Sequence, residues 1–178
     1  MARHLAFLRS FAVVLLCAVA LGPASTVAAT PDPVKLAIFD FEFEDMSAGA
    51  SAGDIAASDS RYLAEVTSSV RDLFAQSGRY SLVDVGGVDA AEVKSRSLHR
   101  CDGCDAAIAQ QLGAEQSFVG VVKRITRTEY TVRYQIRDAN TGAVLSSADS
   151  GLRMGADYSW SRGAVRLIKD QLLEKESQ

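Results

Sequence analysis

The sequence predicts an α+β fold, a mixed sheet of about five strands with helices packed against it in an α/β sandwich. Three observations support this prediction. An apolar strand near the start is followed by a segment of helical periodicity, the later half alternates apolar and polar residues around a hairpin turn, and an amphipathic segment closes the sequence. The expected element order is β-α-β-(α)-α-β-β-β-α, and no repeat or linker marks a second domain.

The first strand is expected at residues 34–43, which are rich in β-branched and aromatic side chains. Both of its faces are apolar before Asp40, as in a central strand, and phenylalanine alternates with acid after it. Residues 45–58 form a loop rich in Ser, Ala and Gly. A helix from Asp59 to Gly78 is indicated by apolar residues spaced by three or four: Leu63, Val66, Val70, Leu73 and Phe74.

The remaining elements follow from the same two periodicities. Residues 79–85 are predicted as a second strand, 88–96 as a short helix, and 106–112 as a helix closed by Gly113. Three strands are expected at 117–126, 130–137 and 143–150, with a hairpin turn at 138–142. A final helix, capped by Asp157 or Ser159, places one apolar face inward: Trp160, Ala164, Val165, Ile168 and Leu172.

The first 29 residues have the pattern of a cleaved signal peptide. Arg3 and Arg9 provide a positive start, residues 11–21 are apolar without interruption, and small residues precede the expected cleavage after Ala29. Leu16 is too bulky to precede a lipidated cysteine, and an uncleaved anchor is the lesser alternative. We therefore expect an exported, periplasmic protein of one domain, residues 30–178, with no membrane-spanning segment in the mature chain.

The charge of the chain is acidic and unevenly distributed. The chain has 19 Lys and Arg and 22 Asp and Glu, which gives a formal net charge of −3. Two of the basic residues lie in the leader and are lost when it is cleaved. Such a chain is a poor general binder of nucleic acid, and we expect no nucleic-acid partner. Residues 30–60 are acidic and residues 123–137 are basic. We expect these two segments to attract each other within the fold.

Cys101 and Cys104 are the cysteines that remain after the leader, beside the remaining histidine, His99. An oxidising compartment favours a structural disulfide between them. Metal binding by these three residues, completed by Asp102 or Asp105, ranks second, because no distant segment supplies a fourth ligand. A thioredoxin-like redox pair ranks last, because the prolines at positions 23, 31 and 33 leave none for the cis-proline loop that faces such cysteines.

Carboxylates gather at the end of the first strand: Asp40, Glu42, Glu44 and Asp45. Strand alternation is expected to place Asp40, Glu42 and Glu44 on one face, where they are weak candidates for a calcium site. No Asp-x-Asp-x-Asp-Gly loop is present, so an exposed acidic strand end is favoured. Hydrolase and nucleotide-binding motifs are absent too. We predict no catalytic residues, no cofactor and no enzymatic activity.

Four motifs together carry a family resemblance. They are Lys-Leu-Ala-Ile-Phe-Asp-Phe-Glu at 35–42, Arg-Tyr-Ser-Leu-Val-Asp at 79–84 before the paired cysteines, the helix end at 108–114, and a late motif represented by Arg153, Asp157, Ser159, Trp160, Arg162 and Gly163. Met154, Gly155 and Ala156 depart from the late motif. With these motifs the chain resembles a family of exported bacterial domains of unknown function. More distantly, it is similar to the α/β domain shared by curli-secretion lipoproteins, penicillin-binding-protein activators and the amino-terminal domain of TolB.

The resemblance implies a periplasmic binding or assembly module whose partner is another periplasmic protein. The candidate binding surface comprises Asp40, Glu42, Glu44, Asp45, Arg153, Asp157, Trp160 and Arg162. The closer family resembles those found in gene neighbourhoods of periplasmic quinoprotein alcohol dehydrogenases, which implies a metal-binding accessory protein of such a system as an alternative. A thiol–disulfide oxidoreductase is a further alternative and ranks below it.

Overall fold

The computed structural model describes residues 32–47, 57–87, 93, 97–126, 128–150 and 160–174. They belong to one compact unit, Asp32–Gln178. The expected signal peptide lies outside the described residues, as do Arg153, Asp157 and, apart from the helical Val93, the expected helix at 88–96. Among the described helices, none has the length and apolarity needed to cross a membrane.

Six strands form one mixed sheet in the order β3-β1-β4-β5-β6, with β2 also paired to β4. They are β1 (Val34–Ile38), β2 (Glu42–Asp45), β3 (Tyr80–Val83), β4 (Gln116–Arg124), β5 (Tyr130–Asp138) and β6 (Val144–Asp149). β1 is parallel to β3 and β4, and β2 is parallel to β4, whereas β4, β5 and β6 are antiparallel neighbours. The predicted mixed sheet is confirmed, with one strand more than expected.

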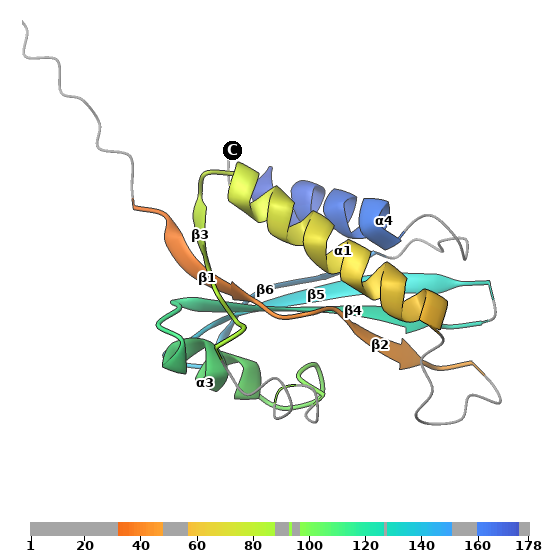
Figure 1. Ribbon diagram of the computed structural model, residues 1–178, viewed down its shortest axis with the longest axis horizontal. Helices are drawn as coiled ribbons and strands as arrows, with labels where there is room; N and C mark the ends of the chain where they lie inside the picture. The colour runs from red at the N-terminus through yellow and green to blue at the C-terminus, as the bar shows by residue number, and fades with distance from the viewer. Residues whose placement is uncertain are drawn as a thin grey trace, which may run out of the picture. The chain divides into compact units, whose positions relative to one another are not determined.

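Helices lie on both faces of this sheet (Figure 1). α1 (Ala57–Gln76) and α4 (Trp160–Ile168), which continues as a π-helix at Lys169–Leu173, lie on one face, and α3 (Cys104–Gln111) lies on the other. The first face encloses the larger apolar cluster, which includes Leu36, Val70, Phe74, Phe118, Tyr134 and Ile168. The second encloses a smaller one, which includes Ala37, Phe39, Ile108, Ala109, Val119 and Val121. The predicted sandwich is confirmed.

The first predicted strand is interrupted by a one-residue bulge. From Ile38 to Glu42 the chain advances four residues, while β4 advances three, from Phe118 to Val121. The extra residue inverts the side-chain alternation, so Ile38 and Phe41 both enter the larger cluster. The amide of Phe41 leaves the ladder and donates to Thr67 Oγ1 of α1 at 2.9 Å. The prediction of one continuous strand over 34–43 is therefore wrong, whereas the other described elements begin and end within two residues of the predicted positions.

Gly120 of β4 provides the space that the bulge needs. A Cβ atom added at this position would lie 2.3 Å from Cζ of Phe41, and the nearest atoms all belong to the Phe41 ring. Gly120 does not have a positive φ, so the requirement for glycine comes from packing and not from backbone conformation. The ring of Phe41 thus covers a position of β4 that must lack a side chain.

We expect Gly120→Ala to lower the free energy of unfolding by about 1–3 kcal/mol, because the added methyl group overpacks the site beneath Phe41. Urea denaturation followed by circular dichroism measures the change. Gly87→Ala is the matched control, since a Cβ there meets nothing within 4 Å, and it should change stability by less than about 0.5 kcal/mol. Equal effects of the two substitutions would contradict the packing argument.

Candidate functional site

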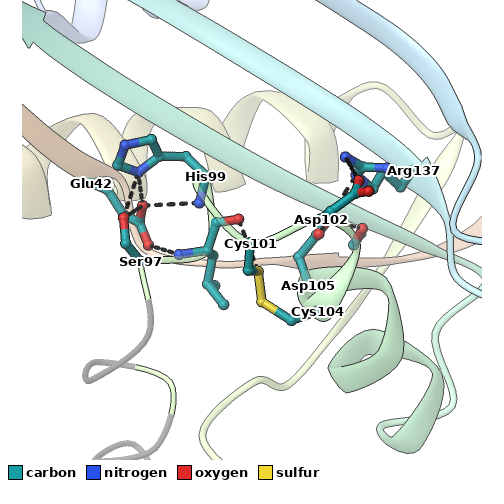
Figure 2. Close-up of a disulfide and its surroundings, with 10 residues drawn as sticks. Glu42, Ser97, His99, Cys101, Asp102, Cys104, Asp105 and Arg137 are labelled. Carbon is teal, nitrogen blue, oxygen red and sulfur yellow. Dashed lines mark hydrogen bonds and ion pairs between the residues drawn. A yellow bond between two sulfur atoms is a disulfide. The ribbon is translucent and has the colours of Figure 1, made fainter.

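The paired cysteines form a disulfide at the start of α3, as the sequence predicts (Figure 2). Gly103, between them, has a φ of 87°, in the left-handed region that favours glycine. This conformation lets the chain turn from Cys101 directly into the helix that begins at Cys104. Both cysteines pack against the smaller apolar cluster. The disulfide therefore ties the turn that ends at Cys101 to the start of α3.

Glu42 of β2 holds the chain immediately before the disulfide. Its carboxylate accepts hydrogen bonds from the amides of Leu98 at 2.6 Å and His99 at 3.1 Å, and it also contacts Nδ1 of His99. Figure 2 shows Ser97 and His99 converging on this carboxylate. Burial raises the pKa of Glu42, but the hydrogen bonds from the His99 ring and from the two amides outweigh it and lower the pKa below its ordinary value.

Glu44, two residues further along β2, lies among basic side chains. Its carboxylate is 3.0 Å from Nζ of Lys123, 2.9 Å from a guanidinium nitrogen of Arg100 and 3.9 Å from Nε2 of His99. The hydrogen bond from Lys123 lowers the pKa of Glu44; burial opposes it, and the bond from Arg100 adds to the lowering. The ring of His99 thus lies between two carboxylates, one near each nitrogen.

Asp40 does not join these two carboxylates. It pairs with Arg71 of α1 at 3.1 Å and is otherwise well exposed. The bulge between β1 and β2 turns its side chain toward the α1 face, while Glu42 and Glu44 face the side of α3. The prediction that the three carboxylates share one face is therefore wrong, because it assumed an uninterrupted strand.

The predicted attraction between the acidic and basic segments is confirmed by direct ion pairs. Arg124 binds Asp45 at 2.8 Å and Asp59 of α1 at 2.6 Å, and Glu44 pairs with Lys123. The Arg124 guanidinium also lies over the ring of Phe43, 4.9 Å from its centroid. These pairs join β2, β4 and the first turn of α1.

A second group of polar residues lies on the other side of the disulfide (Figure 2). Arg137 of β5 pairs with the exposed Asp102 at 3.3 Å and lies 3.7 Å from the carboxylate of Asp105. Asp105 is buried and accepts a hydrogen bond of 2.6 Å from Oγ of Ser117 in β4. Both aspartates that could have completed a metal site are thus engaged with the sheet.

The cysteine segment does not present a preformed metal site. The sulfur atoms of Cys101 and Cys104 are bonded to each other, so they are not available as thiolate ligands. Within the described part of the chain, no group of three or more His, Cys, Asp or Glu side chains is placed to hold a metal ion. A metal at this segment would first require reduction of the disulfide.

Trp160 belongs to the core and not to the surface. Its side chain is buried, stacks on Phe43 at 5.7 Å between ring centroids, and contacts the rings of Tyr62 and Tyr130. Its assignment to the candidate binding surface is therefore wrong, because the apolar face of α4 carries it inward. Arg162 is exposed on α4, whereas Arg153 and Asp157 lie outside the described residues.

A pocket that the sequence analysis did not anticipate opens on the α3 side of the sheet. It has a volume of about 250 Å³ and is lined on the sheet by Val119, Val121 and Lys123 of β4 and by Arg133 and Gln135 of β5. Glu44, His99 and Arg100 line it at the β2 side, and Tyr134 of β5 completes the lining. The alternation of apolar and polar residues in β5 indicates in the sequence that Arg133 and Gln135 share the polar face that lines the pocket. The sequence does not indicate that residues 97–100 lie beside β4.

A family model described as "Protein of unknown function (DUF2380)", named DUF3280, matches residues 34–172. The chain belongs to this family. The match confirms the predicted resemblance to a family of unknown function. Among curated proteins, none matches the chain in sequence.

The chain is also similar to solved structures of bacterial proteins. The C-terminal domain of LpoB from Salmonella enterica is 17% identical, with 71% of this chain and 86% of that chain covered, at a TM-score of 0.50. The same domain from Escherichia coli is 16% identical, with coverages of 68% and 84% and a TM-score of 0.46. TolB from Acinetobacter baumannii is 19% identical, with coverages of 78% and 27% and a TM-score of 0.43. At these identities the likeness to the Salmonella domain concerns the fold alone.

Replacing both cysteines (Cys101→Ser with Cys104→Ser) in a chain that begins at Thr30 should lower the free energy of unfolding by about 2 kcal/mol, the value for closing so short a loop. Urea denaturation measures this change. Thiol titration of the exported wild-type chain should find no free thiol. Dithiothreitol should lower the wild type to the stability of the variant and leave the variant unchanged; free thiols or an unchanged wild type would contradict the structural disulfide.

Glu42→Gln should lower the free energy of unfolding by about 1–3 kcal/mol at pH 7, because charge-assisted hydrogen bonds to the turn at 97–99 are lost. The folded-state pKa of Glu42 is lowered from 4.5, so its contribution is complete above that value and is lost as pH falls through the lower folded pKa. The difference between wild type and variant should therefore shrink on acidification below pH 4.5.

Asp40→Asn is the control for this measurement. Asp40 has 71% of its side chain exposed, and its substitution should change stability by less than about 0.5 kcal/mol. Chemical denaturation across the acidic range follows all three proteins. A difference between wild type and Glu42→Gln that grows as pH falls would exclude the role given to Glu42.

Proposed function

We propose that this protein is a non-catalytic accessory module of the bacterial envelope, which acts in the periplasm by binding another protein. This proposal rests on one observation: the most reactive side chains described in the structure are bonded to one another. The cysteines are joined to each other, and Glu42, Glu44 and His99 are bonded among themselves and to Lys123 and Arg100. These residues hold a surface turn in place, which suits a binding scaffold.

The proposed location rests on two independent observations. Residues 1–29 have the composition of an export signal, and a disulfide at the start of α3 is stable in an oxidising compartment. The fold shared with the LpoB domain is compatible with a binding role, although a fold by itself does not determine function.

The two alternatives receive less support from the structure. A thiol–disulfide oxidoreductase needs a cysteine pair beside a substrate groove, whereas Cys101 and Cys104 pack against the smaller apolar cluster. A metal-binding accessory protein of a quinoprotein system needs free ligands, whereas Glu42 and Glu44 are engaged by His99, Lys123 and Arg100. Both alternatives remain open to direct measurement.

The experiment that tests the proposal is affinity capture with the tagged chain 30–178 from periplasmic extract of the producing bacterium. We expect one protein to be captured in stoichiometric amount and to bind the purified chain saturably when it is purified in turn. In parallel, insulin reduction should match the rate without protein, and native mass spectrometry should give the mass of the metal-free chain. Insulin reduction that the double cysteine variant lacks, or a stoichiometric metal, would replace the binding proposal with the corresponding alternative.

A further inference from the structure

The pocket on the α3 side of the sheet is lined by more basic than acidic side chains. Arg100, Lys123 and Arg133 line it, and Glu44 is the acidic residue among its lining. Asp149 lies opposite Arg133 in β6, and Glu42 contacts His99 of the lining. Among the lining residues themselves the basic side chains outnumber the acidic one, although the chain as a whole has a net charge of −3. The pocket therefore attracts anionic groups against the general charge of the protein.

Glu44 shows that this site can hold a carboxylate. The ammonium of Lys123 and the guanidinium of Arg100 converge on its two oxygens from different elements, at 3.0 Å and 2.9 Å. Both cations keep further donors, because an ammonium has three N–H groups and a guanidinium has five. The Arg100 side chain is also 65% exposed, so it can reach a second carboxylate at the mouth of the pocket.

Arg133 is the basic group of the pocket that is not already engaged. No hydrogen bond or ion pair joins its side chain to another residue in the described part of the chain, and the residue is exposed on β5. Gln135, two residues along the same strand, places its amide on the same face of the sheet. An arginine in this position can bind a carboxylate through two parallel hydrogen bonds, with the amide as a third donor.

The volume of the pocket indicates what kind of ligand presents the anionic group. Its volume of about 250 Å³ is below the range of about 300–1,000 Å³ that is typical of sites for whole small molecules. A pocket of this volume suits a side chain or another small group better than a whole small molecule. Val119 and Val121 form an apolar base, and β6, the neighbouring edge strand, exposes Val144 and Leu145. Acidic side chains flanked by apolar ones on an extended segment complement this surface.

We propose that this pocket binds a carboxylate side chain presented by an acidic, partly apolar segment of the partner protein, with Arg133 as the principal contact. This inference rests on the proposed function and specifies the chemistry of the partner. Lys123 and Arg100 remain bonded to Glu44 and add charge at the mouth of the pocket.

The probe is an acetylated and amidated heptapeptide that alternates Glu and Val, titrated into the isotopically labelled chain 30–178 and followed by amide chemical shifts. We expect saturable shifts at residues 121–123 and 133–135. The same peptide with Gln for Glu should bind about tenfold more weakly, as should the Glu peptide to Arg133→Gln, since a hydrogen bond between charged groups is lost. Arg166→Gln, an exposed arginine of α4, is the matched control and should leave binding unchanged.

Three results would overturn the inference: shifts that the Gln peptide reproduces, shifts that Arg133→Gln leaves unaltered, and the absence of saturation at millimolar peptide. Free N-acetylglutamate that binds as tightly as the peptide would identify a small-molecule site and overturn the assignment to a protein segment. Unfolding midpoints of both arginine variants, compared with the wild type, establish that each chain is folded.

Affinity capture separates the failure of this inference from that of the proposed function. Loss of the captured protein with Arg133→Gln, but not with Arg166→Gln, supports the pocket as the contact. Undiminished capture by Arg133→Gln overturns the pocket and leaves the binding function standing. If the wild-type chain captures no protein, the proposed function fails and the inference fails with it.

Discussion

The extra residue between β1 and β2 determines how both faces of the sheet are built. It inverts the alternation of side chains, so Phe41 enters the larger cluster above Gly120, while Glu42 and Glu44 reach the opposite face. With a regular strand, Glu42 would point into the apolar layer beneath α1, where an unpaired carboxylate is costly. The anchoring of the disulfide segment by Glu42 therefore depends on a local irregularity in the sheet.

Most ion pairs among the described residues connect different secondary-structure elements. Arg124 links β2 and β4 to α1 through Asp45 and Asp59, and Arg137 links β5 to the start of α3. The half-buried pairs remain close to solvent, so their effect is to orient the elements more than to add large stability. These residues belong to the framework, whereas no ion pair joins the side chain of Arg133 to another residue in the described part of the chain.

Local sequence patterns predict most of the helices and strands, because the periodicity of side chains within a helix or strand depends only on residues close in the sequence. The helical spacing of Val66, Val70 and Phe74 predicts α1, and the alternation of Tyr130 to Ile136 predicts β5, without knowledge of their neighbours. The cysteine spacing and the export signal together predict the disulfide. In these cases a few adjacent residues determine the outcome.

The bulge and the pocket escaped prediction because distant residues determine them. Asp40, Phe41 and Glu42 fit a period of two in either register, and only pairing with β4 selects one. Likewise, Arg133 faces a pocket only because residues 97–100 fold beside β4. The sequence places Trp160 both on an inward helix face and in the candidate binding surface, and the burial of its ring supports the first.

The position of β1 has a consequence for the order of assembly. β1 lies between β3 and β4, and Lys35 meets Glu115 across a separation of 80 residues. A chain synthesised from its amino terminus therefore releases this inner strand first, and the edge of β1 that pairs with β4 stays unpaired until β4 follows. Such non-local pairing slows folding and leaves an apolar edge exposed. The side of β1 that faces β4 is thus covered only after residues 116–124 have been made.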